Sequence, residues 1–518
     1  MIHQIPVQNT RQFSHFICDF IVAENYADKN DVSKIILERK SKPINRSVLT
    51  EILVEQNAAI SISSATKKNI SLLNNENCFT ITTAHQPCLF GGPLYTIYKA
   101  ISAIKLAEQY KKDFPENDFV PVYYIGSEDH DLEELNHFYL FNKKIEWQTN
   151  QDGAVGSMQL SGMDIVFEEL ENLLKNETKK DEIVALLKSF YTENNSMSFA
   201  FRQLMNHFLG KYGLVILDAN DKRLKQTFKS IFTDELVNQN SFKLLNDKTW
   251  LQNFADEKLQ ITPREINLFY LDKNVRERIV FENENYSTKN AAFNLSKSEI
   301  EKFVEQSTEK LSPNVILRPL YQSTILPDVA FIGGGSEVTY WLQLKTVFDF
   351  YKVPFPKIYL RDSAEWIDDA SESKRKKWNF SIEEIFADVN FLKNKFLEEN
   401  GGLQIDHEIE KVNTELLLLQ NKINAHDKAL EGVSAATMVQ IKNQLEQLQK
   451  KIVQNDKKKQ ADTLSQIERW KEKLFPQNHL QERQMSFIEL YLKHGESFVD
   501  ELYNCFNPEE KTLKVITS

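Results

Sequence analysis

Short runs of consecutive apolar residues alternate, up to about residue 360, with longer segments in which apolar residues recur every three or four positions. The short runs have the length of β-strands, and uninterrupted apolar runs are typical of parallel strands that are covered on both faces. We expect strands at 79–84, 120–126, 214–218, 315–317, 329–332 and 358–360. Helical patterns separate most of these runs, which predicts βαβ units and a doubly wound α/β sheet.

The remaining segments of this region are expected to surround the sheet. Residues 1–75 are predicted to be mostly helical, and residues 164–211 form a charge-rich helical stretch that is an insertion or a long crossover. Residues 240–310 contain short strand-like pieces at 268–271 and 279–281, which indicates a second, smaller insertion. The expected domains are a core at 1–380 with connecting insertions near 150–212 and 240–310, a helical coiled-coil domain at 381–475, and a C-terminal helical segment at 476–518 that returns to the core.

Residues 403–469 have a different pattern, because they contain no aromatic side chain and their apolar positions step alternately by three and four. The steps join Ile409, Val412, Leu416, Leu419, Ile423, His426 and Leu430, and after Gly432 they join Met438, Ile441, Leu445, Leu448 and Ile452. Two heptad seams separated by a glycine predict an antiparallel coiled-coil hairpin. We expect this hairpin to dock on a second subunit and His426 to set the register as a polar seam residue.

The composition of the chain limits the classes of function that it can have. The chain has 518 residues, which indicates two or three structural units, and its net charge of −11 argues against general binding of nucleic acid or of an anionic membrane. Its apolar runs are too short to span a bilayer. The four cysteines are scattered without a C-x-x-C pair, which disfavours a thiolate zinc site and favours a reducing compartment. The first residues lack the pattern of a signal peptide, so we expect a cytoplasmic protein without nucleic-acid or membrane partners.

The first predicted strand leads into a glycine-containing turn and a helix. His85 and Gln86 end the strand, and Gly91 and Gly92 precede the helix. Free N–H groups at such a turn and the positive end of a helix dipole can bind an anion, although many α/β proteins have such turns. Lys99 lies on the mostly apolar helix, where it either reaches an anion near the strand ends or extends to solvent.

The second predicted strand is followed by SEDHDLEELNH. Glu128, Asp129, His130 and Asp131 place three carboxylates and an imidazole where the carboxyl ends of parallel strands line a ligand crevice. Such a group can bind an ammonium ion or transfer protons, and its alternative role is an acidic cap on a helix. His130 and His137 would lie about 10 Å apart along a helix, too far to share an ion. We therefore expect no metal site.

The third motif is IGGGSEVTYW, which reads as a strand end, three glycines and the start of a helix. The backbone N–H groups of Gly333, Gly334 and Gly335 could hold a phosphate, although neither standard nucleotide-binding pattern is present. The alternative is a tight turn followed by a capped helix, with Glu337 in the first helical turn.

Four further polar residues near predicted strand ends complete the candidate binding site. They are Arg318, Gln322, Tyr340 and Arg361. Arginine suits bidentate contact with carboxylates or phosphates, but an exposed or ion-paired role is commoner for either arginine considered singly.

Three long segments together resemble the cysteine ligases of bacillithiol biosynthesis. They are HQPCLFGGPLYTIYKAISAIKLA, PVYYIGSEDHDLEELNH and RPLYQSTILPDVAFIGGGSEVTYWLQLKTVF. The resemblance extends along the whole chain in order and includes the late coiled coil. His85 stands where the family more often has Gln, and GGG stands where GPG is common. The HIGH and KMSKS strings of synthetases are absent, so the nucleotide-handling roles of those strings cannot be transferred.

The resemblance implies a Rossmann-like core related to class I aminoacyl-tRNA synthetases and nucleotidyl transferases, with a coiled coil that forms a homodimer. It implies that L-cysteine is joined to the amine of glucosaminyl-malate, with ATP activating the cysteine carboxyl and Mg²⁺ accompanying ATP or ADP. Glu128, Asp129 and Asp131, with His130 beside them, would bind the cysteine ammonium or act as the base, and Arg318 or Arg361 would bind the malate carboxylates. The alternatives are another nucleotide-dependent ligase or nucleotidyl transferase on the same core, and a coiled-coil interaction protein without catalysis.

Overall fold

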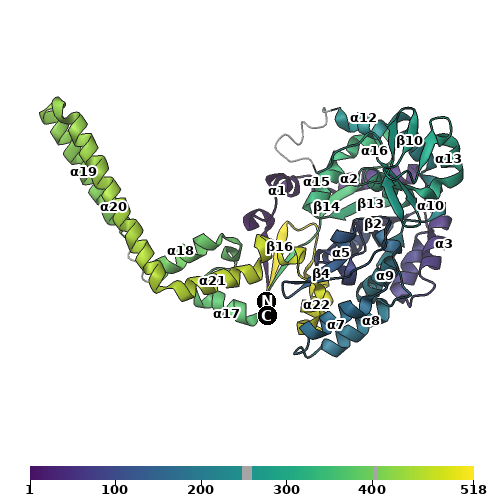
Figure 1. The fold of residues 1–518 in the computed structure, drawn as a ribbon, viewed down its shortest axis with the longest axis horizontal. Helices are drawn as coiled ribbons and strands as arrows, with labels where there is room; N and C mark the ends of the chain where they lie inside the picture. The colour runs from purple at the N-terminus through teal and green to yellow at the C-terminus, as the bar shows by residue number, and fades with distance from the viewer. Residues whose placement is uncertain (248–259, 401–404, 518) are drawn as a thin grey trace. The chain divides into compact units, whose positions relative to one another are not determined.

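The computed structural model describes residues 1–247, 260–400 and 405–517 (Figure 1). The chain forms two compact units. The larger unit comprises Ile2–Glu365 and Leu480–Lys514, and the smaller comprises Trp366–His479 with the two chain ends. Parts of the expected second insertion (248–259) and of the expected coiled-coil domain (401–404), and residue 518 of the expected C-terminal segment, lie outside the described residues.

The larger unit is built on a five-stranded sheet with the order β14-β13-β2-β3-β6, in which every neighbouring pair is parallel. The strands are β2 (Cys78–His85), β3 (Asp118–Ile125), β6 (Val215–Asp218), β13 (Asp328–Gly333) and β14 (Lys357–Leu360). The first strand of this sheet in chain order, β2, lies in its middle. The strands β3 and β6 follow toward one edge, and β13 and β14 then extend the sheet on the other side of β2. This order confirms the Rossmann-like α/β prediction and places the topological switch point between β2 and β13.

The central strands are buried along almost their whole length, which explains their uninterrupted apolar sequences. The β2–β3 register pairs Cys78 with Asp118 and His85 with Ile125, so the two strands end at the same level. Helix α5 (Tyr95–Asp113) packs on both strands and is buried on most sides. The loops after these strands therefore meet at one edge of the sheet.

The helical predictions on either side of β2 and β3 are confirmed. Residues 1–75 contain α1 (His15–Val22), α2 (Lys29–Ser41), α3 (Arg46–Gln56) and α4 (Ser64–Leu72), preceded by the unpredicted strand β1 (Ile2–Pro6). The segment between β3 and β6 contains the hairpin β4 (His137–Leu140) and β5 (Lys143–Glu146), followed by α7 (Met163–Leu173), α8 (Lys180–Phe190) and α9 (Met197–Leu209).

The second insertion forms two small antiparallel sheets. One contains β7 (Leu268–Asp272), β8 (Val275–Arg278) and β12 (Leu311–Pro313), and the other contains β9 (Val280–Glu282), β10 (Asn285–Ser287) and β11 (Asn294–Ser296). The strand predicted at 315–317 is wrong, because helix α14 (Leu317–Ile325) begins there. The Asn314 side chain accepts the N–H of Ile316 at 2.9 Å. Val315 is exposed, Ile316 is buried just before the helix, and Leu317 is the first helical residue.

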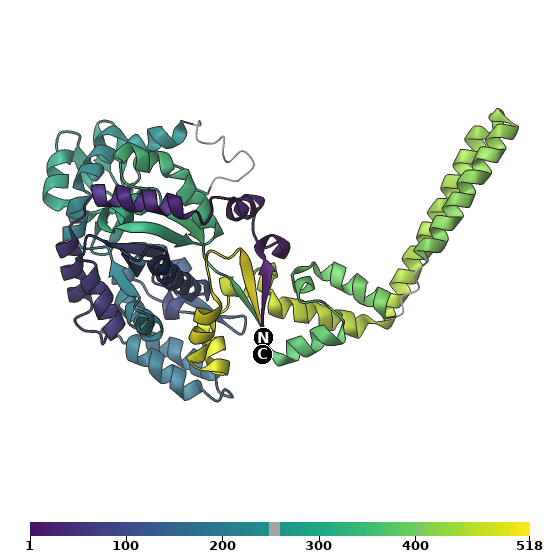
Figure 2. The ribbon, with the colours of Figure 1, turned by 180° about the vertical axis from the view of Figure 1, so that it is seen from behind.

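The smaller unit contains the predicted helical hairpin (Figures 1 and 2). Its helices are α17 (Asp369–Lys377), α18 (Val389–Glu399), α19 (Asp406–His426), α20 (Glu431–Lys459) and α21 (Ala461–Leu474). Helices α19 and α20 pack together, but the turn lies at Asp427–Leu430 rather than at Gly432, which is inside α20. The predicted seam is also partly wrong, because Val412, Leu419 and Leu448 are 41, 49 and 51% exposed.

The C-terminal segment is helical only in its first part. Helices α22 (Phe487–His494) and α23 (Ser497–Cys505) belong to the larger unit, and the chain then forms the unpredicted strand β16 (Thr512–Thr517). This strand lies between β1 and β15 (Ala364–Ile367), and the boundaries between the two units fall within β15 and β16. Across the described ranges, no helix has both the length and the hydrophobicity needed to cross a bilayer.

Candidate active site

A cavity of about 480 Å³ opens where the loops after the central strands meet. Its lining includes eleven of the residues selected from the sequence, namely His85, Gln86, Lys99, Glu128, Asp129, Arg318, Gly334, Gly335, Glu337, Tyr340 and Arg361. They come from segments that follow β2, β3, β13 and β14 and from helices α5, α14 and α15 (Gly335–Gln343). The cavity therefore lies at the switch point, where ligands bind in open α/β sheets.

Lys99 and Glu337 form an ion pair in the wall of the cavity. The Lys99 Nζ lies 2.5 Å from a Glu337 carboxylate oxygen and also donates to the Ala84 carbonyl at 3.2 Å. Glu337 in turn accepts the N–H of Gly334 at 2.9 Å. Burial lowers the pKa of Lys99, whereas the Glu337 charge opposes that shift. The anion that Lys99 reaches is therefore a side chain of the protein.

Arg318 lines the cavity without a carboxylate partner among the described residues. Its guanidinium donates to the Gln322 side-chain oxygen at 3.0 Å and to the Tyr340 hydroxyl at 2.9 Å. It also lies 5.4 Å from the centre of the Tyr124 ring. Burial opposes its positive charge, but Tyr340, Tyr124 and, more weakly, Glu337 raise the pKa of Arg318. With neutral hydrogen-bond partners, this arginine can bind an anion in the cavity.

Arg361, after β14, has a buried partner from the returning C-terminal segment. It lies 2.7 Å from Glu482, which is fully buried, and it donates to the Ser363 hydroxyl at 2.9 Å. Its Nε is buried without a hydrogen-bond partner among the described atoms, close to the space that a side chain on Gly334 would enter. Arg483, the next residue after Glu482, also lines the cavity and is exposed.

Asp129 is held by contacts from three segments. It accepts hydrogen bonds from the Gln86 amide at 3.0 Å and from the His130 backbone N–H at 2.7 Å. The Arg276 guanidinium lies 3.4 Å from the same carboxylate. Burial opposes ionisation, but the Arg276 charge and the hydrogen bonds from Gln86 and the His130 backbone hold the pKa of Asp129 below its usual range. Asp129 is therefore a fixed negative charge.

The two glutamates near the end of β3 have different surroundings. Glu128 forms an ion pair with the fully buried Lys225, which also donates to a backbone carbonyl. Glu134 lines the cavity, and no ion pair is found for it within the described part of the chain. Partial burial and the charges of Asp131 and Asp129 raise the pKa of Glu134. A carboxyl with a raised pKa is suited to proton transfer near neutral pH.

His85 is half-buried in the lining of the cavity and is neutral. Burial, and after it the Lys99 charge, lowers the pKa of His85 to about 3. Its ring centre lies 5.1 Å from that of Tyr95, and its Nδ1 lies 3.9 Å from the Cys88 thiol. Burial raises the pKa of that thiol to about 12, so Cys88 is not a thiolate nucleophile.

Six of the residues selected from the sequence lie outside the cavity lining. They are Gly91, Gly92, His130, Asp131, Gln322 and Gly333. The N–H groups of Gly91 and Gly92 donate to the carbonyls of Cys88 and Leu89 at 3.1 and 3.0 Å, so this turn binds its own backbone rather than a phosphate.

The helix expected after the acidic motif is also shorter than its sequence suggests. Only Leu132–Leu135 (α6) is helical, so His130 and Asp131 do not lie on a helix with His137. Asp131 is exposed, and its side chain makes no cap hydrogen bond. In the part of the chain that the structure describes, no three His, Cys, Asp or Glu side chains are grouped as metal ligands.

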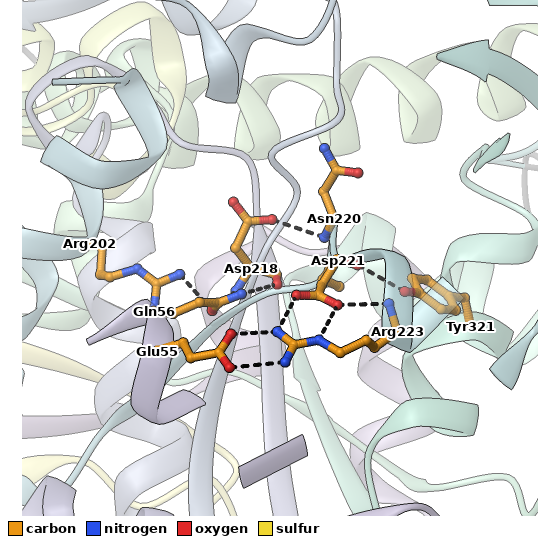
Figure 3. Close-up of polar contacts among 9 residues, drawn as sticks. Glu55, Gln56, Arg202, Asp218, Asn220, Asp221, Arg223 and Tyr321 are labelled. Carbon is orange, nitrogen blue, oxygen red and sulfur yellow. Dashed lines mark hydrogen bonds and ion pairs between the residues drawn. The ribbon is translucent and has the colours of Figure 1, made fainter. Parts of the chain in front are cut away.

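A polar network fixes the end of the edge strand β6 (Figure 3). The Gln56 side chain donates to the Asp218 carbonyl at 2.7 Å and accepts the Asp218 N–H at 3.1 Å. It thereby makes the backbone hydrogen bonds that a further strand would make at this edge of the sheet. The Asp218 carboxylate accepts the Ser127 hydroxyl at 2.5 Å and the Asn220 N–H at 3.0 Å. This network supports Ser127 and Asn220, which both line the cavity.

Several lining residues were not selected from the sequence. They include Tyr95, Ser127, Glu134, Asn220, Arg276 and Arg483. Asn220 and Ser127 follow strand ends, so the rule that found Asp129 could have found them. Arg276 lies on a strand of the insertion and Arg483 lies after the coiled coil, and neither has a local sequence signal.

The fold and the cavity define a Rossmann-like α/β protein with a charged ligand crevice at its switch point. The family described as bacillithiol biosynthesis BshC, N-terminal Rossmann-like domain, matches residues 3–362, and the corresponding C-terminal coiled-coil domain matches residues 364–518. The chain belongs to this family, and it is an enzyme of the ligase class.

Similar proteins cover almost the whole chain. Proteins named "Putative cysteine ligase BshC" from Flavobacterium psychrophilum and Flavobacterium johnsoniae are 38% and 36% identical, over 99% of this chain and 98% and 99% of theirs. One with the same name from Christiangramia forsetii is 35% identical over 98% of this chain and 95% of its own.

Proposed function

We propose that this protein joins L-cysteine to the amine of glucosaminyl-malate and so forms the amide bond of bacillithiol. The observation that carries the proposal is a single cavity with a cation, Arg318, that has no ion-pair partner among the described residues, and carboxylates from another strand end, Asp129 and Glu134. Cysteine is a zwitterion and glucosaminyl-malate carries carboxylates and an amine. Both substrates therefore need cationic and anionic partners within one site.

The cationic side is suited to the malate carboxylates. Arg318 presents a planar guanidinium whose present partners are neutral, and Arg483 lines the same cavity. An arginine can bind a carboxylate through two parallel hydrogen bonds. We assign the malate group to these residues and not to Arg361, because Arg361 is already paired with Glu482.

The acidic side is suited to the amines. Asp129 stays ionised and can bind the cysteine ammonium. The sugar amine must lose a proton as it forms the amide, and Glu134 has the raised pKa that suits a base. Glu128 is neutralised by Lys225, so we assign it a structural role.

ATP, with accompanying Mg²⁺, is the activating nucleotide in this proposal, and when bound it supplies the leaving group that the cysteine carboxyl lacks. The residues that fit a phosphate are Gly335 and Ser336 at the start of α15, with Arg361 beside them, whereas the Gly334 N–H already donates to Glu337. The buried Nε–H of Arg361 has no partner among the described atoms, and Lys99 compensates the Glu337 charge in the same turn. These features favour an anion at this helix start.

We further propose a homodimer that forms through the coiled coil in the cytoplasm. The support is the row of seam leucines and valines that the α19–α20 hairpin leaves exposed, represented by Val412, Leu419 and Leu448. A second hairpin would cover these side chains.

The test is incubation of the purified protein with cysteine, glucosaminyl-malate and ATP–Mg²⁺, followed by mass analysis of the thiol product. The proposal predicts bacillithiol and consumption of ATP, and Glu134→Gln is expected to lower kcat at least about 100-fold. Absence of product under varied nucleotides and metals would contradict it. Turnover of a different acid or amine would identify another ligase on the same core.

A further inference from the structure

Arg276 enters the site from strand β8 of the second insertion and is held on several sides. Its Nε lies 3.2 Å from the Ser312 hydroxyl, and one terminal nitrogen donates to the Pro313 carbonyl at 3.3 Å. Its guanidinium carbon lies 4.1 Å from the centre of the Phe269 ring. The side chain is only 8% exposed. These contacts fix the direction of its remaining N–H groups.

The other terminal nitrogen of Arg276 points at His130. It lies 2.8 Å from His130 Nδ1, and the His130 ring centre lies 5.3 Å from that of Phe269. A guanidinium donates hydrogen bonds and accepts none, so Nδ1 must be the acceptor. A neutral imidazole that accepts at Nδ1 carries its proton on Nε2.

The neighbouring carboxylate does not compete for this ring nitrogen. Asp129 Oδ1 lies 3.6 Å from His130 Nδ1, which is beyond a normal hydrogen bond. The same oxygen accepts the backbone N–H of His130 at 2.7 Å and faces Arg276 at 3.4 Å. Its orientation is therefore set by the backbone and the arginine. A carboxylate often accepts the Nδ1–H of a histidine, but Asp129 and His130 do not make this hydrogen bond.

We propose that Arg276 is a positioning residue that fixes His130 as a neutral ring with its proton on Nε2, so that His130 does not serve as the base. A residue of the second insertion thereby determines which nitrogen of His130 in the acidic motif carries the proton. The assignment of the base rests on the proposed function, but the position of the ring proton does not.

The test is ¹⁵N nuclear magnetic resonance of the histidine rings in the full-length protein without substrates, at about pH 7.5. His130→Gln assigns the His130 signals. We expect the wild-type ring to be neutral with its proton on Nε2. Arg276→Met should increase the share of rings with a proton on Nδ1 at least severalfold, and Arg276→Lys, which retains a donor, should reverse most of that change.

Arg278 provides a matched control, because it lies on the same strand and its guanidinium is 6.0 Å from the centre of the same Phe269 ring. Arg278→Met should leave the His130 signals unchanged. A proton on Nδ1 in the wild-type protein would overturn the proposal, as would unchanged signals in Arg276→Met. Because no substrate is present, this result is independent of whether the protein proves to ligate cysteine.

Discussion

Replacing Arg318 with methionine is expected to weaken substrate binding without destabilising the fold. The guanidinium has two neutral hydrogen-bond partners, at 3.0 and 2.9 Å, and no carboxylate partner within the described residues. Burial disfavours this cation, but Tyr340, Tyr124 and the Glu337 charge outweigh burial and raise the pKa of Arg318. Removing the charge loses two hydrogen bonds, which cavity water can replace, and it removes the cost of burying a cation together with the attraction of Glu337. We expect the free energy of unfolding to change by less than about 1 kcal/mol.

The expected loss of affinity is much larger. A hydrogen bond to a charged group contributes about 1.5–3 kcal/mol, so losing the contact with one malate carboxylate should raise the KM for glucosaminyl-malate about 10- to 150-fold. The KM for cysteine should change much less. Product formation followed by mass analysis measures both constants, and urea unfolding measures stability.

Arg39 provides a control with the opposite behaviour. It is a buried arginine that forms an ion pair with the buried Asp328 and donates to the carbonyls of Ser323 and Pro354 at 2.6 and 2.7 Å. Arg39→Met would leave Asp328 as an uncompensated buried charge, and we expect it to lower the free energy of unfolding by about 3–5 kcal/mol. If Arg318→Met is destabilised to this extent and its KM for glucosaminyl-malate is unchanged, Arg318 is a structural residue and the reasoning is refuted.

Three further predictions concern other parts of the chain. Glu128→Gln should lower the free energy of unfolding by about 3 kcal/mol, because it leaves the charge of the fully buried Lys225 without its ion-pair partner. Adding Lys225→Met should restore most of the lost stability. A Glu128→Gln variant that is as stable as the wild type in urea would contradict this. Burial raises the pKa of Asp362 to about 6, above its unfolded value of about 4, so protonation stabilises the fold at low pH and this stability is lost as pH rises through 6. Asp362→Asn should therefore be about 2 kcal/mol more stable than the wild type at about pH 8 and similar at about pH 4, and equal unfolding midpoints at both pH values would argue against it. Leu419→Glu should give monomers in light scattering, whereas the exposed Asn421→Glu should not, and a dimeric Leu419→Glu would place the dimer contact elsewhere.

The strands of the main sheet could be predicted because each is a short, uninterrupted apolar run between turn residues. The run at 315–317 has the same appearance, yet it leads into α14, whose first residue is Leu317. A short apolar run cannot by itself distinguish a buried strand from a buried helical turn. The Asn314 side chain accepts the N–H groups of Ile316 and Leu317 where this helix begins, and side-chain hydrogen bonds of that kind are not visible in an apolar pattern.

The candidate site was predictable to the extent that it follows strand ends. His85, Asp129 and Glu337 were found in this way, because parallel strands end at one edge of the sheet. Arg276 and Glu482 were not, because their positions depend on how an insertion and the returning C-terminal segment pack on the core.

The glycine turns show a second limit of sequence patterns. The turn at Gly91 and Gly92 uses its N–H groups within its own backbone. The turn at Gly334 and Gly335 lines the cavity, although the Gly334 N–H donates to the Glu337 side chain. Both sequences contain consecutive glycines, and that pattern does not show which N–H groups have partners. Whether a backbone N–H is free for a ligand is a property of the folded loop.

The most direct test of the account is a crystal structure of the protein with glucosaminyl-malate bound. The account predicts that the ligand occupies the cavity at the carboxyl ends of β2, β3 and β13, with its malate carboxylates against Arg318 and its amine facing Glu134. A ligand bound at another surface, with this cavity left empty, would contradict it.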